Sequence, residues 1–127
     1  MKDNKITIQI NKPARDVYAF YINPKNIPLW INSIVEEETN EWPIKIGTIY
    51  RNKNRQGQLT EYVVTALKEN RLFELKTTRG NYHVRYTHRN LDNGVSELEY
   101  YEWVDNGNIE APFTLDMLNK LKEIIEK

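Results

Sequence analysis

Six consecutive segments between residues 35 and 104 have the alternating, aromatic and β-branched character of strands. Turn-forming residues separate many of them, among them Gln56-Gly57, Gly80-Asn81 and Asn93-Gly94. Strands joined by such short turns pair in opposite directions, so this part of the chain predicts one antiparallel sheet. The expected strands are Val35–Thr39, Thr48–Gln56, Leu59–Lys68, Leu72–Thr78, Tyr82–Asn90 and Val95–Val104.

The chain before this run predicts a further strand and two short helices. Ile6–Ile10 alternates strictly with a period of two, which is typical of a strand. Pro13 suits the first position of a helix, and an apolar stripe follows it. Asn23-Pro24 repeats the helix-start signal and opens a second helix that carries Trp30. Pro28 keeps that second helix short or irregular.

The last segment, Pro112–Lys127, predicts the one long helix of the chain. Its apolar residues recur at helical spacing and form a single stripe: Met117, Leu118, Leu121, Ile124 and Ile125. A sheet must cover one face, and this helix is the only long cover available, so we expect the sheet to curve around it. The predicted fold class is α+β, with a curved antiparallel sheet of six to seven strands around a C-terminal helix and two short helices after the first strand.

Length and composition limit the function. The 127 residues suit a single domain over 1–127, which would bury about 68% of the surface of the unfolded chain. The 18 basic and 18 acidic residues balance, so the chain lacks the positive charge that general nucleic-acid binding needs. Without cysteine it has no disulfide, thiolate nucleophile or iron–sulfur ligand. The two histidines lack metal-ligand spacing and no glycine-rich phosphate loop is present, so we expect no metal and no cofactor.

The apolar segments are all short. None approaches the ~20 apolar residues that a membrane-spanning helix needs, so no integral membrane segment is expected. The start, Met1–Lys5, lacks the apolar stretch of a signal peptide. We therefore predict a cytoplasmic protein, and the abundance of Asn, Ile and Lys indicates a bacterial one.

The order of these motifs resembles the START/polyketide cyclase-dehydrase (SRPBCC) superfamily, which has the helix-grip fold. The motifs that carry the resemblance span nearly the whole chain and are Ile8–Tyr18 with its Pro13, Asn23-Pro24 with Trp30, Ile46-Gly47-Thr48, Glu61–Thr65 with Asn70-Arg71-Leu72, and Leu118, Leu121-Lys122 and Glu126. The resemblance implies a cavity between the concave face of the sheet and the last helix. That helix is shorter here than in much of the superfamily, so either the cavity mouth is more open or the loop Asp105–Ala111 closes it.

Strand alternation indicates which side chains face this cavity. One face of the predicted sheet is rich in aromatic residues, and Trp30 and Met117 of the helices are expected to approach it. The predicted ligand-binding residues are Trp30, Tyr50, Tyr62, Phe73, Tyr82, Tyr86, His88, Glu99, Tyr101, Trp103 and Met117. The acidic run Glu36-Glu37-Glu38 is expected to be a solvated strand, not a metal site.

The last strand can pair in two registers. If Asn93-Gly94 is a two-residue type I′ turn, then Tyr86 faces Tyr101 and His88 faces Glu99. A three-residue loop places Leu98 opposite His88 and moves every side chain of the last strand to the other face. We favour the first register, because it pairs aromatic with aromatic residues and Arg85 with Glu102.

Three functions follow from this interpretation. The first is a non-enzymatic protein that encloses a small hydrophobic or aromatic molecule. The second is a cyclase- or dehydratase-like enzyme in which His88 and Glu99 form a general-base pair, which requires both side chains to face the cavity. The third is an interaction module similar to the chaperone-activator branch of the superfamily, which would act through its surface.

Overall fold

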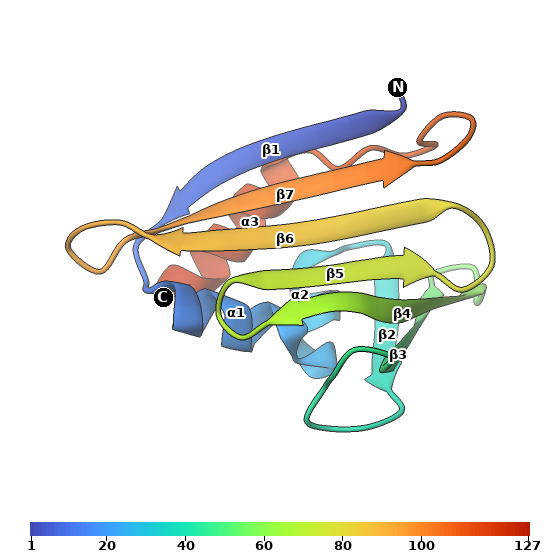
Figure 1. Cartoon of the computed structure of the whole chain (residues 1–127), viewed down its shortest axis with the longest axis horizontal. Helices are drawn as coiled ribbons and strands as arrows, with labels where there is room; N and C mark the ends of the chain where they lie inside the picture. Colours follow the sequence, from blue (N-terminus) through green and yellow to red (C-terminus); the bar gives the residue numbers. More distant parts are fainter.

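Seven strands form one antiparallel sheet in the computed structural model, which describes residues 1–127 (Figure 1). The strands follow the order β1-β7-β6-β5-β4-β3-β2, so only the β1–β7 contact joins segments distant in sequence. The strands are β1 (Asp3–Ile10), β2 (Ile34–Thr39), β3 (Ile49–Asn54), β4 (Leu59–Lys68), β5 (Leu72–Thr77), β6 (Tyr82–Asn90) and β7 (Ser96–Val104). The predicted fold class is confirmed, and β4 and β6 have the predicted bounds.

The helices lie on one face of the sheet and follow the predicted order (Figure 1). They are α1 (Ala14–Ile22), the short 3₁₀ turn η1 (Pro24–Asn26), α2 (Ile27–Trp30) and α3 (Leu115–Glu126). α3 begins later than predicted, because Thr114 caps it by accepting the Met117 N–H at Oγ1 (3.4 Å). Figure 1 also shows β2 and β3 running steeply across the direction of β1, β7 and β6, which gives the sheet its curvature.

The core lies between the concave face of the sheet and the helices. α1 contributes Val17 and Tyr21, α2 contributes Trp30, and α3 contributes Leu118 and Leu121, all at most 1% exposed. α3 packs against β1, α1 and α2, so it covers the β1 side of the sheet. The inner face of β2–β5 is therefore not covered by α3 but faces α1, α2 and the loop before α3.

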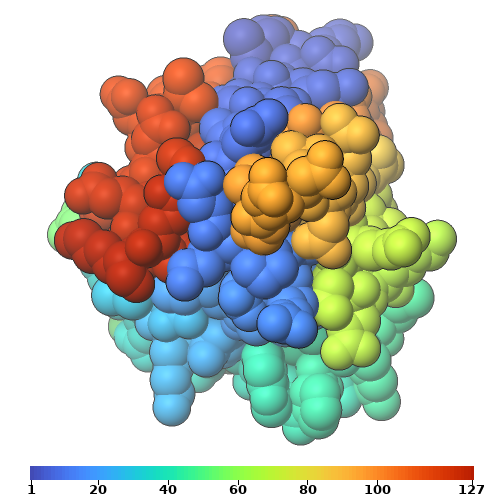
Figure 2. All heavy atoms as spheres, turned by 90° about the vertical axis from the view of Figure 1, so that its left-hand side faces the viewer, coloured from blue at the N-terminus to red at the C-terminus, as the bar shows by residue number.

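One end of the molecule is held together by contacts between segments far apart in sequence. Figure 2 shows α1, the C-terminal part of α3 and the β6–β7 loop side by side at this end. The Ala14 N–H donates to Asn90 Oδ1 (2.9 Å), and the Asn11 N–H donates to Glu126 Oε2 (2.8 Å). These bonds fix the start of α1 between the last strands and the last helix.

The β6–β7 hairpin has the register that the sequence did not favour. Val84 pairs with Glu102 and His88 with Leu98, so the predicted pairs Tyr86–Tyr101 and His88–Glu99 are wrong. Asn93 and Gly94 do have the positive φ angles of a primed turn (61° and 74°). However, the Leu91 N–H donates to the Val95 carbonyl (2.8 Å), which closes a loop of three residues and shifts the pairing by one.

A bulge in β2 changes which of its residues face the core. The pairing with β3 shifts between Ile34, opposite Asn54, and Glu36, opposite Lys53. The extra residue breaks simple alternation, so that Ile34 and Glu37 both reach the inner side.

Candidate functional site

A cavity of about 280 Å³ lies between the inner face of the sheet and the helices. Thirteen of its 18 lining residues are hydrophobic, so it suits a mainly apolar occupant. A cavity of about 150 Å³ holds benzene, so this one has room for a two-ring molecule. The lining residues are Tyr21, Ile27, Ile31, Ser33, Ile34, Glu37, Tyr50, Asn52, Asn54, Thr60, Tyr62, Phe73, Leu75, Tyr82, Val84, Tyr86, Tyr100 and Phe113.

Part of the aromatic wall matches the sequence prediction. The predicted residues that line the cavity are Tyr50, Tyr62, Phe73, Tyr82 and Tyr86. They come from β3, β4, β5 and β6, whose alternation correctly indicated the inward face. Tyr21 of α1 joins them and stacks on Tyr86 with ring centroids 4.4 Å apart.

Three residues predicted to face the cavity lie on the outer face of the sheet because of the hairpin register. Trp103 stacks on His83 with centroids 4.6 Å apart, and the Tyr101 ring lies near Lys5 Nζ (5.4 Å). Glu99 pairs with Thr87 and Thr7 on the neighbouring strands, away from His88. The proposed His88–Glu99 general-base pair is therefore wrong.

The charge pairing that favoured the wrong register is also absent. Arg85 lies opposite Tyr101 on β7, and its Nε donates to Glu74 Oε1 on β5 (2.9 Å). Glu102, its expected partner, lies on the inner face and is completely buried.

Glu102 anchors the segment that closes one side of the cavity. It accepts hydrogen bonds from the Tyr82 hydroxyl (2.6 Å), Asn4 Nδ2 (2.8 Å) and the Phe113 N–H (2.7 Å). The last bond places Phe113 in the cavity wall, where its ring stacks on Tyr100 (4.2 Å). The residue that closes this side thus follows the loop Asp105–Ala111, which does not itself line the cavity.

The remaining predicted residues lie outside the cavity wall. Trp30 is fully buried and packs edge-on against Phe113, so it supports the wall from behind. Met117, in the first turn of α3, is half-buried. His88 lies behind Tyr21, with its Nε2 2.6 Å from the Tyr21 hydroxyl. Burial lowers the pKa of His88 to about 4, so its imidazole is neutral at neutral pH.

Burial also keeps the wall tyrosines neutral. It raises the pKa of Tyr62 to about 12 and raises the pKa values of Tyr50 and Tyr86 further. The Tyr50 hydroxyl donates to the Ile22 carbonyl (2.6 Å), which fixes that ring against the helix side. The wall therefore presents neutral aromatic rings, several of them held in place by hydrogen bonds of their hydroxyls.

Glu37 is the functional candidate that the sequence analysis missed. It was expected on a solvated strand, but it lines the cavity, and its Oε2 is buried without a hydrogen-bond partner in the protein. Burial raises the pKa of Glu37 to about 8. Asn52, which lies opposite on β3, lowers this pKa, but its effect is smaller than that of burial. Regular alternation from the inward-facing Ile34 would put Glu37 on the outer face with the exposed Val35, and the β2 bulge reverses this.

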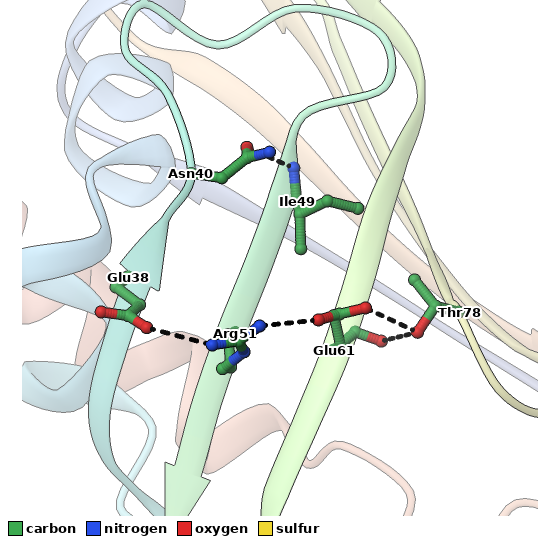
Figure 3. Close-up of polar contacts among 6 residues, drawn as sticks. All are labelled: Glu38, Asn40, Ile49, Arg51, Glu61 and Thr78. Carbon is green, nitrogen blue, oxygen red and sulfur yellow. Dashed lines mark hydrogen bonds and ion pairs between the residues drawn. The ribbon is translucent and has the colours of Figure 1, made fainter.

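The acidic neighbours of Glu37 do lie on the solvated face. Glu38 Oε1 lies 3.7 Å from Arg51 Nη1, and Arg51 Nη2 donates to Glu61 Oε2 (3.1 Å), as Figure 3 shows. Glu36 lies 3.6 Å from Lys53 on the same face. The structure contains no group of three or more His, Cys, Asp or Glu side chains arranged to bind a metal ion. None of its helices is long and apolar enough to cross a membrane.

No family model matches the chain, and no curated protein matches it. Solved structures do resemble it. The protein XoxI from Bacillus cereus is 13% identical, with a TM-score of 0.76 over 98% of this chain and 96% of its own. Protein CV1439 from Chromobacterium violaceum is 14% identical, with a TM-score of 0.71 over 99% of this chain and 98% of its own.

A third similar structure is the solution structure of the Aha1 dimer from Colwellia psychrerythraea. It is 16% identical, with a TM-score of 0.70 over 99% of this chain and 97% of its own. These similarities cover nearly the whole chain and show that it shares its fold with these three proteins, while the low identities transfer no activity.

Proposed function

We propose that this protein binds a small hydrophobic or aromatic molecule in the cavity between its sheet and helices, without catalysing a reaction. The observation that carries the proposal is the cavity of about 280 Å³ with an aromatic wall. Affinity would come mainly from apolar burial, at roughly 25 cal/mol per Å², while a few polar groups orient the ligand.

The fold supports the resemblance to the SRPBCC superfamily, and we include membership of that superfamily and a cytoplasmic location in the proposal. The curved seven-stranded sheet and the C-terminal helix have the expected arrangement. A cyclase- or dehydratase-like reaction through His88 and Glu99 is not part of it, because Glu99 lies on the outer face.

An interaction module of the chaperone-activator kind is a second candidate. The Aha1 dimer shows that this fold occurs in a protein whose copies associate, which supports a surface role. Large apolar side chains that are more than half exposed add support: Leu29, Trp42, Ile46, Leu59 and Leu115. This function would depend on the surface and would not need the cavity.

Native mass spectrometry of the protein purified from a bacterial host tests the first candidate. We expect a bound small molecule that denaturing extraction releases. Isothermal titration with naphthylmethanol, a neutral two-ring probe, then measures the cavity directly. Saturable binding that Tyr86→Ala weakens and Tyr101→Ala leaves intact supports the proposal, because Tyr86 lines the cavity and Tyr101 lies on the outer face.

Circular dichroism of both variants provides the folding control. The proposal is wrong if the purified protein is free of ligand and naphthylmethanol does not bind. It is also wrong if the probe binds and Tyr101→Ala weakens binding as much as Tyr86→Ala does. Either result directs attention to the surface and to the interaction module.

A further inference from the structure

The cavity wall contains one acidic residue and no basic residue. Glu37 is the only Asp or Glu among the lining residues, and the wall contains no Lys, Arg or His. A buried carboxylate is normally paired or hydrogen-bonded, because leaving it unpaired in an apolar site is costly. Here one oxygen of Glu37, Oε2, is buried and has no partner in the protein. The wall thus offers a carboxyl group with one buried oxygen that a ligand can pair with.

The position of Glu37 is built into the sheet. The β2 bulge turns its side chain inward, and Asn52 is its cross-strand neighbour on β3. The basic residues of this region face the other way: Arg51 and Lys53 contact Glu38 and Glu36 on the outer face. No protein cation on these strands is therefore positioned to neutralise Glu37.

The surrounding rings suit a positive charge as well. Tyr50 on β3, Tyr62 on β4 and Tyr86 on β6 line the same cavity, and the charge of Glu37 contributes to raising the pKa of each. An ammonium group gains energy over an aromatic face, and more so when it is removed from water. Glu102, which accepts a hydrogen bond from the Tyr82 hydroxyl, also contributes to raising the pKa of Tyr86.

We propose that the ligand of this cavity is a small arylalkylamine, an aromatic ring system that carries an aliphatic amino group, whose protonated nitrogen pairs with the Glu37 carboxylate while its rings lie against the tyrosine wall. The inference rests on the proposed binding function and names the chemical class of its ligand. A neutral ligand of the same shape would leave Glu37 without an ionic partner.

Binding of such an amine is linked to a proton. Burial raises the pKa of Glu37 to about 8, so the empty protein holds a proton on this carboxyl at neutral pH. The other titratable side chains that face it are Tyr50, Tyr62 and Tyr86, which stay neutral there. An ammonium ion favours the ionised carboxylate and releases that proton. Affinity for the amine should therefore rise as the pH increases toward about 8, level off, and fall at higher pH where the ammonium group loses its own proton.

Calorimetry with two matched probes tests the inference. Naphthylmethylamine and naphthylmethanol share the same rings and differ in carrying an ammonium or a hydroxyl group. At about pH 9 we expect the wild-type protein to bind the amine at least about tenfold more tightly than the alcohol. Titrations at neutral pH in buffers of different ionisation enthalpy should show release of close to one proton for each amine bound.

Two variants of adjacent residues provide the contrast. Glu37→Gln keeps the shape of the side chain and should weaken amine binding at least about tenfold while naphthylmethanol still binds. Glu38→Gln removes a carboxylate from the outer face and should change neither affinity. These results together would support the amine class and assign the recognition to Glu37.

The opposite outcomes separate the two proposals. If the alcohol binds as tightly as the amine, or if amine binding is unaffected by Glu37→Gln, the amine class is wrong and the binding function stands. If affinity for both probes falls as the pH rises through about 8, protonated Glu37 acts as a hydrogen-bond donor, which also overturns the amine class. If neither probe binds and the purified protein carries no ligand, the proposed binding function itself is wrong.

Discussion

Glu37 and Glu38 are consecutive residues of β2, yet they lie in opposite environments. Glu38 is exposed and belongs to a ladder of charges with Arg51 and Glu61 across β2, β3 and β4 (Figure 3). Glu37 lies among aromatic rings, with one oxygen buried and unpaired. Glu38 therefore has a cation beside it in the protein, whereas the buried oxygen of Glu37 has no hydrogen-bond partner there. The proposed ligand contact rests on this contrast between the two faces of one strand.

The same contrast holds for the aromatic residues of β7. Tyr100 is 1% exposed and packs against Tyr86 and Phe113, while Tyr101 contacts Lys5 and Arg85 on the outer face. Tyr100→Ala should lower the free energy of unfolding by about 3–5 kcal/mol, because it leaves a cavity in a packed region. Tyr101→Ala should have a much smaller effect. Urea unfolding of both variants measures the difference, and equal effects would contradict the register of β7.

The acidic residues Glu102 and Glu99 lie on opposite faces of β7. Glu102→Ala leaves three donors without their acceptor, namely the Tyr82 hydroxyl, Asn4 Nδ2 and the Phe113 N–H. We expect a loss of about 3 kcal/mol in the free energy of unfolding, together with release of Phe113 from the cavity wall. Glu99→Ala on the outer face should change stability by no more than about 0.5 kcal/mol. Amide hydrogen exchange at residues 109–114 would report the loosening, which should be absent in Glu99→Ala.

The titration of Glu37 gives stability a defined pH dependence. Its pKa of about 8 lies above the ordinary value of 4.5, so between these values the folded protein holds a proton that the unfolded chain releases. The free energy of unfolding of the wild-type protein should therefore fall as the pH rises through this range. Glu37→Gln removes the titration, so this variant should be more stable than wild type at pH 9, by up to about 4–5 kcal/mol.

Urea unfolding at about pH 5 and about pH 9 is the measurement for this prediction. The gain from Glu37→Gln should nearly vanish at the lower pH, where Glu37 is protonated. Glu38→Gln is the matched control and should show no such pH-dependent gain. A gain that does not vary with pH would mean that Glu37 titrates normally.

The smallest effect is expected on the outer face itself. Arg51→Ala removes the centre of the ladder between Glu38 and Glu61, whose side chains are 62% and 38% exposed. Exposed ion pairs contribute little and are screened by salt. We expect a slight loss of stability in low-salt buffer that disappears in concentrated salt, as measured by thermal unfolding. A loss that persists in concentrated salt would show that Arg51 contributes through packing and not through charge.

Local patterns were sufficient for the architecture of this protein. The strands Leu59–Lys68 and Tyr82–Asn90 have the bounds that their alternation predicted. The inward aromatic residues Tyr50, Tyr62, Phe73 and Tyr86 were identified correctly, because alternation within a regular strand depends only on that strand. The order of elements followed from the turns and prolines for the same local reason.

The composition of the site depended on two shifts in strand pairing, each by one residue, which local sequence patterns do not reveal. Both faces of β7 carry aromatic and acidic residues, so its sequence suits either register. The three donors gathered around Glu102 decide in favour of one, since they come from β1, β6 and the segment before α3. The β2 bulge likewise depends on pairing with β3, and it moves Glu37 from the solvated face into the cavity. The helices, strands and their order could be predicted because they follow from local periodicity. Which charges are buried could not, because strand register is set by contacts between strands and not by the pattern of any one strand.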